Sequence, residues 1–162
     1  MAGAVQRQLD GVGLKILHEL QHNARMPYAE LGRRVGLSTP AVMERVKRLE
    51  ETGVIAGYRA QLNEEAIGYP VKAFISLHNV DGNVLSRIAK LTKTIPELLE
   101  CHRVTGDSSY ILKVVAASVR DLERIIDKLS PLAATSTSLV LSTVVADRVL
   151  APRLDPETDS EA

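Results

Sequence analysis

The chain contains few of the residues that mark several common classes of protein. Its 162 residues include one cysteine, one phenylalanine, four tyrosines and no tryptophan. The single cysteine, Cys101, excludes a framework of intrachain disulfides. Scarce aromatic residues weigh against the base-stacking surfaces of RNA-binding and single-strand-binding proteins. No apolar run approaches the roughly 20 residues that cross a bilayer, and the chain opens without a signal-like apolar segment. These absences predict a soluble, cytoplasmic protein of one or two small domains.

A formal net charge of zero conceals an uneven distribution of charge along the chain. Residues 1–60 contain nine Lys and Arg against six Asp and Glu, which is a net charge of +3. Residues 61–162 contain eleven against fourteen, which is a net charge of −3. The basic first part suits contacts with phosphates, whereas the second part does not need to touch nucleic acid.

Residues 28–48 have the pattern of two short amphipathic helices joined by one tight turn. Leu31 and Val35 share one face of the first helix, which Gly36 can end in the left-handed conformation. Ser38 is suited to cap the second helix, and Pro40 is tolerated in its first turn. The residues expected on the buried face of the second helix are Val42, Val46 and Leu49. This is the pattern of a helix-turn-helix, whose second helix enters the major groove of double-stranded DNA.

The residues on either side extend this motif into a domain over residues 1–62. Asp10 is suited to cap a helix that begins next to it, runs to about His22 and precedes the helix-turn-helix. Residues 54–62 are β-prone and contain a glycine, which predicts a hairpin and therefore a winged helix-turn-helix. Residues 63–69 are expected to form a linker.

From Pro70 the pattern of apolar residues changes, and strands alternate with helices. The order β-α-β-β-α-β predicts a ferredoxin-like domain over residues 70–148 and an α+β fold for the chain. Helices would cover one face of its sheet, so Phe74 and its neighbours on the bare face predict a homodimer. Residues 149–162 form an acidic tail that is expected to be disordered. Strands are expected at residues 71–78, 98–105, 110–115 and 139–145, and helices at 84–94 and 118–129. The inward-facing residues expected in the last helix are Val119, Leu122, Ile126 and Leu129.

Candidate DNA contacts lie on the exposed side of the second helix of the motif and beside it. Lys47 can donate to guanine and Glu44 can accept from cytosine, while backbone N–H groups at the helix start suit a phosphate. Arg45 borders the buried face and can equally brace the fold by binding a carboxylate. A solvated helix face is the alternative interpretation, but the agreement of turn, cap and buried stripe favours DNA binding. The candidates are Arg33, Arg34, Ser38, Thr39, Pro40, Met43, Glu44, Arg45, Lys47, Arg48 and Arg59.

The order and spacing of several motifs are more specific than any one motif. The first half contains, in order, Glu30-Leu31, Val35-Gly36-Leu37-Ser38, Arg45-Val46-Lys47-Arg48-Leu49-Glu50 and Gly53-Val54-Ile55. The second half contains Cys101, Val104-Thr105-Gly106-Asp107, Tyr110 and the pair Thr135 and Thr137. Together these residues resemble the Lrp/AsnC family of feast/famine transcription regulators.

The resemblance implies a sequence-specific regulator that responds to a small amino-acid effector and controls amino-acid metabolism. It also implies homodimers that assemble further, commonly to octamers, with the effector bound between subunits. Three features depart from the family pattern. Pro27 stands where a Ser or Thr of a capping box is usual, and Ser109 replaces the second acid of a Gly-Asp-x-Asp turn. Ala133-Ala134 replaces a bulkier or basic residue, so the last two departures bear on whether an effector binds.

A free amino acid needs donors for its carboxylate and an acceptor for its ammonium group. Backbone N–H groups around Gly106 can provide the donors, and Asp107 can provide the acceptor. Thr135 and Thr137 share a strand face and can add hydroxyl groups. An ordinary hairpin turn beside a threonine-rich strand is the alternative, and spacing alone favours it. The candidates are Thr105, Gly106, Asp107, Ser108, Ser109, Thr135 and Thr137.

No arrangement of side chains typical of a catalytic centre occurs, so the chain is not expected to be an enzyme. His18 and His22 are four residues apart but lack a third metal ligand, and no metal or cofactor is predicted. Three functions remain open. They are an amino-acid-responsive transcription regulator, an architectural DNA-wrapping protein of the same scaffold without an effector, and an amino-acid-sensing module that regulates an enzyme.

Overall fold

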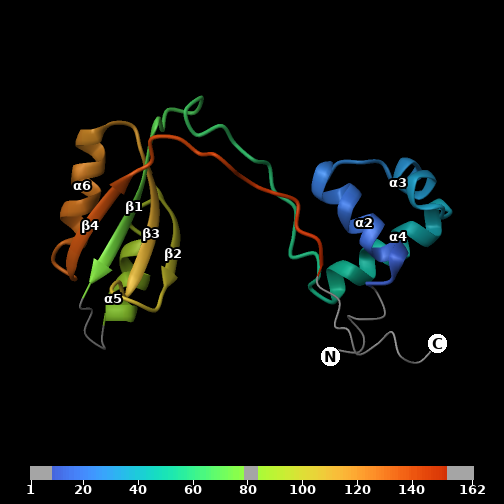
Figure 1. The fold of residues 1–162 in the computed structure, drawn as a ribbon, viewed down its shortest axis with the longest axis horizontal. Coiled ribbons are helices and arrows are strands. Elements are labelled where there is room, and N and C mark those ends of the chain that lie inside the picture. Colours follow the sequence, from blue (N-terminus) through green and yellow to red (C-terminus); the bar gives the residue numbers. More distant parts are fainter. Residues whose placement is uncertain (1–8, 79–83, 153–162) are drawn as a thin grey trace. The chain divides into compact units, whose positions relative to one another are not determined.

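The computed structural model describes residues 9–78 and 84–152, which divide into two compact units (Figure 1). Of the described residues, 9–60 and 145–152 form one unit, and those between Gln61 and Val144 form the other. The chain therefore leaves the first unit, builds the second and returns to the first. Among the described residues, no helix is both long and apolar enough to cross a membrane.

The first unit contains the three helices α2 (Gly11–His22), α3 (Tyr28–Val35) and α4 (Thr39–Glu51). Asp10 caps α2 as predicted, because its carboxylate accepts a hydrogen bond of 2.7 Å from the backbone N–H of Gly13. The three helices enclose one apolar core, which confirms the predicted buried faces. The residues buried in this core are Ile16, Leu17, Leu20, Met26, Leu31, Val35, Val42, Val46 and Leu49.

The turn between α3 and α4 depends on two glycines. Gly36 ends α3 in the predicted left-handed conformation, with a φ of 76°. Gly32 lies against the turn, and a Cβ atom at this position would come within 2.7 Å of the carbonyl oxygen of Leu37. Ser38 occupies the predicted N-cap position of α4, although its side chain makes no capping hydrogen bond.

The hairpin predicted over residues 54–62 is wrong, because this segment contains no strand. Val54 and Ile55 pack instead against the helical core, and the Ile55 N–H donates to the carbonyl oxygen of Leu49 at 2.9 Å. Farther along, burial and the neighbouring Glu50 carboxylate raise the pKa of Tyr58 above its usual range. An isolated two-stranded hairpin is marginally stable, and these contacts with the helices replace it.

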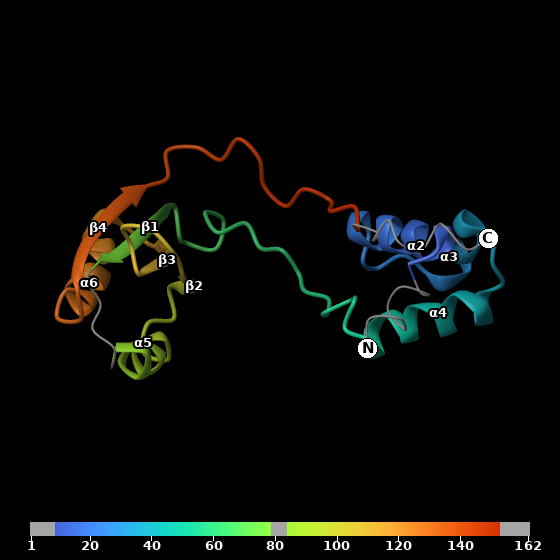
Figure 2. The same ribbon diagram turned by 60° about the horizontal axis from the view of Figure 1, so that its bottom comes forward.

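The second unit is built on a four-stranded antiparallel sheet in the order β2-β3-β1-β4 (Figures 1 and 2). This order confirms the predicted ferredoxin-like arrangement and the α+β class. Its strands are β1 (Val71–His78), β2 (Leu98–Arg103), β3 (Tyr110–Ala116) and β4 (Ala134–Leu139), and its helices are α5 (Val84–Thr92) and α6 (Val119–Leu129).

Both helices of the second unit contribute to a core on one face of the sheet. Ser118 caps α6 by accepting a hydrogen bond from the backbone N–H of Asp121. Val119 was expected inside but is 67% exposed, because it lies in the first turn of α6, and Ile125 is buried further along the helix. The buried residues of this core are Ala73, Ile75, Leu77, Ile88, Ile95, Tyr110, Leu112, Val114, Ala116, Leu122, Ile125 and Leu129.

The last strand lies earlier in the chain than predicted. Residues 139–145 were expected to form it, but β4 ends at Leu139, and Leu141 is 90% exposed. The register pairs Thr135 with Leu77 and Thr137 with Ile75, so the threonines themselves are in the strand. Hydroxyl-bearing residues suit β4 because it is an edge strand with little covering.

The opposite face of the sheet carries Phe74, which is 41% exposed. Its direct neighbours on the adjacent strands are Lys113 and Ser138, so this face mixes apolar and polar side chains. The homodimer inferred from this face in the sequence stays a prediction.

Candidate DNA-binding and effector-binding sites

The buried face of α4 determines which of its side chains meet solvent. Val42, Val46 and Leu49 are at most 1% exposed and point into the core. The predicted base-reading residues therefore lie on the outside of the helix, where Met43 is 48% exposed. Ser38, Thr39, Pro40, Met43, Glu44, Lys47 and Arg48 are all exposed.

Two ion pairs run along the exposed side of α4. The guanidinium of Arg48 binds the carboxylate of Glu44, and the ammonium of Lys47 lies 3.5 Å from a carboxylate oxygen of Glu51. Both pairs are four residues apart and well exposed, so each contributes only about 0.5 kcal/mol or less. Such weak pairs hold the cations at the surface and release them easily to a phosphate or a base.

Arg34 and Arg45 are instead bound within the first unit. Arg34 lies 2.9 Å from Glu19 and 2.7 Å from Glu30, and its hydrogen bonds to these carboxylates raise its pKa. Arg45 binds Asp10, the cap of α2, and thus links α4 to the start of α2. Burial alone would raise the pKa of the Asp10 carboxyl, but the hydrogen bonds from Gly13 and Arg45 hold it below its usual value.

Arg33 and Arg59 differ from those two arginines. Both are exposed, and within the described residues neither forms an ion pair. Of the eleven predicted DNA-binding residues, Arg34 and Arg45 therefore differ from the rest, because each binds a carboxylate from another element, Glu19 or Asp10. Sequence reasoning identified the double possibility for Arg45 but did not separate Arg33 from Arg34.

The predicted effector loop closes between β2 and β3. The N–H of Val104 donates to the carbonyl oxygen of Ser109 at 3.1 Å, and the N–H of Ser109 donates to that of Leu77 at 2.8 Å. Gly106 adopts a φ of 108°, which favours glycine. An open hollow lies at this loop and brings together Arg103, Val104, Thr105, Asp107, Ser108 and Ile111.

This hollow contains only part of the predicted effector set. Gly106 and Ser109 belong to the loop without lining the hollow, while Thr135 and Thr137 lie on β4, beyond β1. Arg103 also lines the hollow, although it was not among the candidates from the sequence. Its position at the end of β2, directly before the loop, was the available signal.

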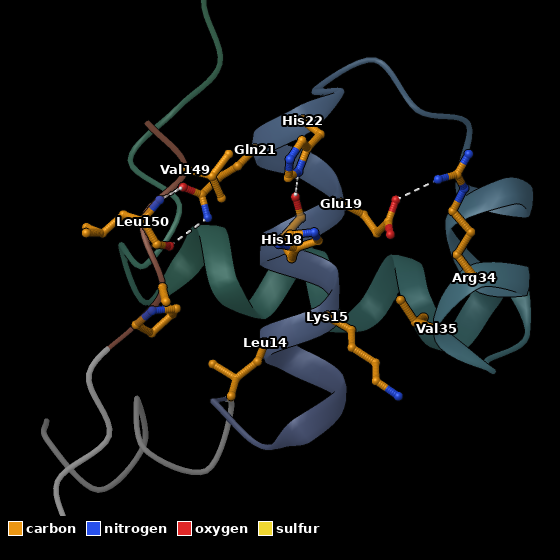
Figure 3. A pocket seen from close by; sticks show the side chains of 12 residues that line it. Leu14, Lys15, His18, Glu19, Gln21, His22, Arg34, Val35, Val149 and Leu150 are labelled. Carbon is orange, nitrogen blue, oxygen red and sulfur yellow. Dashed lines mark hydrogen bonds and ion pairs between the residues drawn. The ribbon is translucent and has the colours of Figure 1, made fainter. Parts of the chain in front are cut away.

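A second hollow, of about 760 Å³, lies where the chain returns to α2 (Figure 3). The side-chain amide of Gln21 donates to the carbonyl oxygen of Leu150 at 3.0 Å and accepts from its N–H at 2.8 Å. Residues 149–152 of the predicted tail thus lie in the first unit, and residues 153–162 fall outside the described residues. The lining residues are Leu14, Lys15, His18, Glu19, Gln21, His22, Arg34, Val35, Val149, Leu150, Ala151 and Pro152.

His18 and His22 face each other in this hollow, with ring centroids 4.4 Å apart. The Nδ1 atom of His22 lies 2.8 Å from the carbonyl oxygen of His18, so the helix backbone already occupies one ring nitrogen. In the described part of the chain, no three potential ligands gather around a metal-sized site.

Comparison with known proteins identifies both units. Residues 9–50 match the AsnC-type helix-turn-helix domain, and residues 72–150 match the Lrp/AsnC ligand binding domain. The chain belongs to the Lrp/AsnC family. This confirms the resemblance seen in the sequence, and the family consists of transcription regulators, not enzymes.

This Lrp/AsnC regulator is similar to relatives and to solved structures along most of its length and most of theirs. The leucine-responsive regulatory protein of Rhizobium meliloti is 41% identical over 122 residues, which cover 74% of this chain and 78% of that relative. A transcriptional regulator from Neisseria meningitidis in complex with L-Met has a TM-score of 0.82 at 28% identity, covering 88% of this chain and 96% of that one. The feast or famine regulatory protein from M. tuberculosis complexed with L-methionine has a TM-score of 0.81 at 35% identity, covering 89% and 99%.

Proposed function

We propose that this Lrp/AsnC regulator senses a free amino acid and controls genes of amino-acid metabolism by binding double-stranded DNA as a homodimer or a larger assembly. The observation that supports this most directly is the hollow at the β2–β3 loop, where Arg103 and Asp107 bring opposite charges together. A zwitterionic amino acid carries the complementary pair. Two similar solved structures are complexes with methionine.

In this proposal α4 reads the DNA sequence. Lys47 and Glu44 meet base edges in the major groove, and Met43 and Thr39 offer apolar contacts to thymine methyl groups. Backbone N–H groups at the start of α4, near Ser38 and Thr39, face a phosphate. The residues assigned to the DNA backbone are Arg33, Arg48 and Arg59. A symmetric dimer would recognise a pseudo-palindrome with half-sites about 34–36 Å apart or a multiple of this spacing.

The effector would bind through its two charged groups. Arg103 donates to the carboxylate, and Asp107 accepts from the ammonium group. Thr105 and Ser108 add hydroxyl groups at the same hollow, and Ile111 offers an apolar surface for the amino-acid side chain. Thr135 and Thr137 lie on another strand, so we assign them no direct contact within one subunit.

The test is a thermal-shift screen of the whole chain against free amino acids at millimolar concentration, beginning with L-methionine and L-leucine. A ligand at about 100 times its dissociation constant stabilises a protein by roughly 2.7 kcal/mol. Asp107→Asn and Arg103→Gln should abolish the shift. Arg120→Gln, an exposed arginine on α6, is the matched control and should retain it. A shift that survives both variants would reject this site.

An architectural DNA-wrapping protein without an effector is the second candidate. It is favoured by Ser109, which leaves the loop with one acid, Asp107, where two are usual in the family. The absence of any thermal shift, together with DNA binding that no amino acid alters, would select this alternative. Sedimentation of the free protein and of its DNA complex would measure the assembly in both cases.

A further inference from the structure

The end of β1 carries a histidine that joins two parts of the effector region. The loop after β2 and the edge strand β4 are separated by β1, which lies between β3 and β4. His78 is the last residue of β1. Its Nδ1 atom lies 3.1 Å from the backbone carbonyl oxygen of Asp107, and its Nε2 atom lies 2.9 Å from Oγ of Ser136.

The chemistry of these two partners determines the form of the imidazole. A carbonyl oxygen can only accept a hydrogen bond, so Nδ1 of His78 must carry the proton and donate to Asp107. In the neutral ring Nε2 is then an acceptor, and the hydroxyl of Ser136 donates to it. The imidazole thus accepts a hydrogen bond from the Ser136 hydroxyl on β4 and donates one to the Asp107 carbonyl oxygen in the loop.

This contact is different from the other bonds of the loop. Ser109 is attached to Leu77 and to Val104, and these bonds fix the base of the loop. Of the hydrogen bonds described for residues 104–109, the one from His78 is the one that reaches Asp107. The residue proposed to hold the ammonium group therefore depends on His78 for its backbone position.

We propose that His78 is a positioning residue of the effector site, which fixes Asp107 and connects it to Ser136 on β4. From β4 the chain continues through residues 140–144 and enters the first unit at Val145. A displacement of Asp107 by a bound amino acid is passed through the imidazole to the strand that leads back to the DNA-binding unit. This inference rests on the proposed effector function, but its hydrogen bonds can be tested without any ligand.

Two substitutions separate the two bonds. The amide nitrogen of an asparagine occupies the position of Nδ1, so His78→Asn keeps the bond to Asp107 and loses the one to Ser136. The longer His78→Gln places its amide near the position of Nε2, so it keeps Ser136 and loses Asp107. His102→Asn is the matched control, because His102 lies on the same sheet face and its Nε2 atom binds Glu100 at 3.0 Å.

The first measurement is a long-range ¹H–¹⁵N NMR spectrum of the imidazoles in the free protein, at a pH where they are neutral. We expect His78 in the Nδ1–H form and His102 in the Nε2–H form, because a carboxylate accepts the Nε2 proton of His102. His78 found in the Nε2–H form would overturn the proposal, whether or not any amino acid binds.

The second measurement is titration with L-methionine, the ligand of two similar structures. His78→Gln should weaken binding about five- to tenfold, as one lost hydrogen bond does, whereas His78→Asn should bind nearly as wild type. In His78→Asn the amide signal of Ser136 should no longer shift when ligand is added.

Equal behaviour of both variants and of His102→Asn would reject the positioning role. If the wild-type protein binds no amino acid, the proposed effector function is wrong. The role of His78 is then decided without ligand, by the tautomer of its imidazole and by the chemical shift of the Asp107 amide in each variant.

Discussion

Nη1 of Arg45 lies 2.8 Å from Oδ1 and 2.9 Å from Oδ2 of Asp10, so the candidate recognition helix is tied to the cap of the first described helix. The same carboxylate accepts the N–H of Gly13. One side chain thus starts α2 and orients α4. A residue predicted to contact DNA therefore has a structural partner inside the protein.

Asp10→Ala should lower the free energy of unfolding at pH 7 by about 1–2 kcal/mol, because it removes the helix cap and the partner of Arg45. The measurement is urea unfolding. The contribution of Asp10 should be complete above its unfolded-state pKa of 3.8 and should disappear as the pH falls through its lower folded-state pKa. Wild type and Asp10→Ala should therefore converge in stability in strong acid. Arg45→Gln should lose the smaller part of the effect, because the cap remains.

Gly32→Ala should destabilise the helix-turn-helix by about 1–3 kcal/mol, because its Cβ would press on the backbone carbonyl of Leu37. Gly11→Ala is the matched control, since a Cβ at that position meets nothing within 4 Å. Thermal unfolding of both variants should show a loss only for Gly32→Ala. An unchanged melting temperature in that variant would mean that the turn relaxes without cost.

Arg33→Ala should weaken binding to specific and random duplexes by the same factor and should reduce the slope of log affinity against log salt concentration by about one. Lys47→Ala should instead reduce the preference for the specific duplex, because the lost contact is to a base. Fluorescence anisotropy on a selected operator and a scrambled duplex, at several salt concentrations, measures both effects. Arg34→Ala should mainly reduce stability, since Glu19 and Glu30 bind this side chain. Uniform loss in both Arg33→Ala and Lys47→Ala would contradict this division.

Gln21→Ala should release the returning segment from α2, because the amide of Gln21 makes both hydrogen bonds to Leu150. The Leu150 N–H should then exchange with solvent much faster in hydrogen-exchange experiments. Gln21→Glu retains the oxygen that accepts from Leu150 and should preserve more of this protection. Equal exchange rates in wild type and both variants would show that the segment is held by other contacts.

The elements that the sequence predicted correctly are those whose signals are local. Asp10 precedes a helical apolar pattern, Gly36 separates two such patterns, and Ser118 is followed three residues later by Asp121. Each signal needs only neighbours within one helical turn. The order of strands and helices in the second unit follows from the same kind of local periodicity.

The parts that the sequence did not predict depend on partners far along the chain. The register of β4 is determined by Ile75 and Leu77 on β1, and not by the apolar run after Leu139. Val54 and Ile55 pack against the helical core, which lies close to them in space, and therefore do not form a hairpin. For the effector region, the turn was predicted, but Arg103 joins it through the end of β2, and β1 separates it from Thr135 and Thr137.

The return of the chain to α2 makes the second unit an insertion in the DNA-binding unit, since the boundaries fall at Gln61 and Val144. An inserted unit is connected to the surrounding unit at both of its ends. A change in the distance between the first and last residues of the second unit therefore acts on both connections. The two hydrogen bonds between Gln21 and Leu150 hold the second connection against α2.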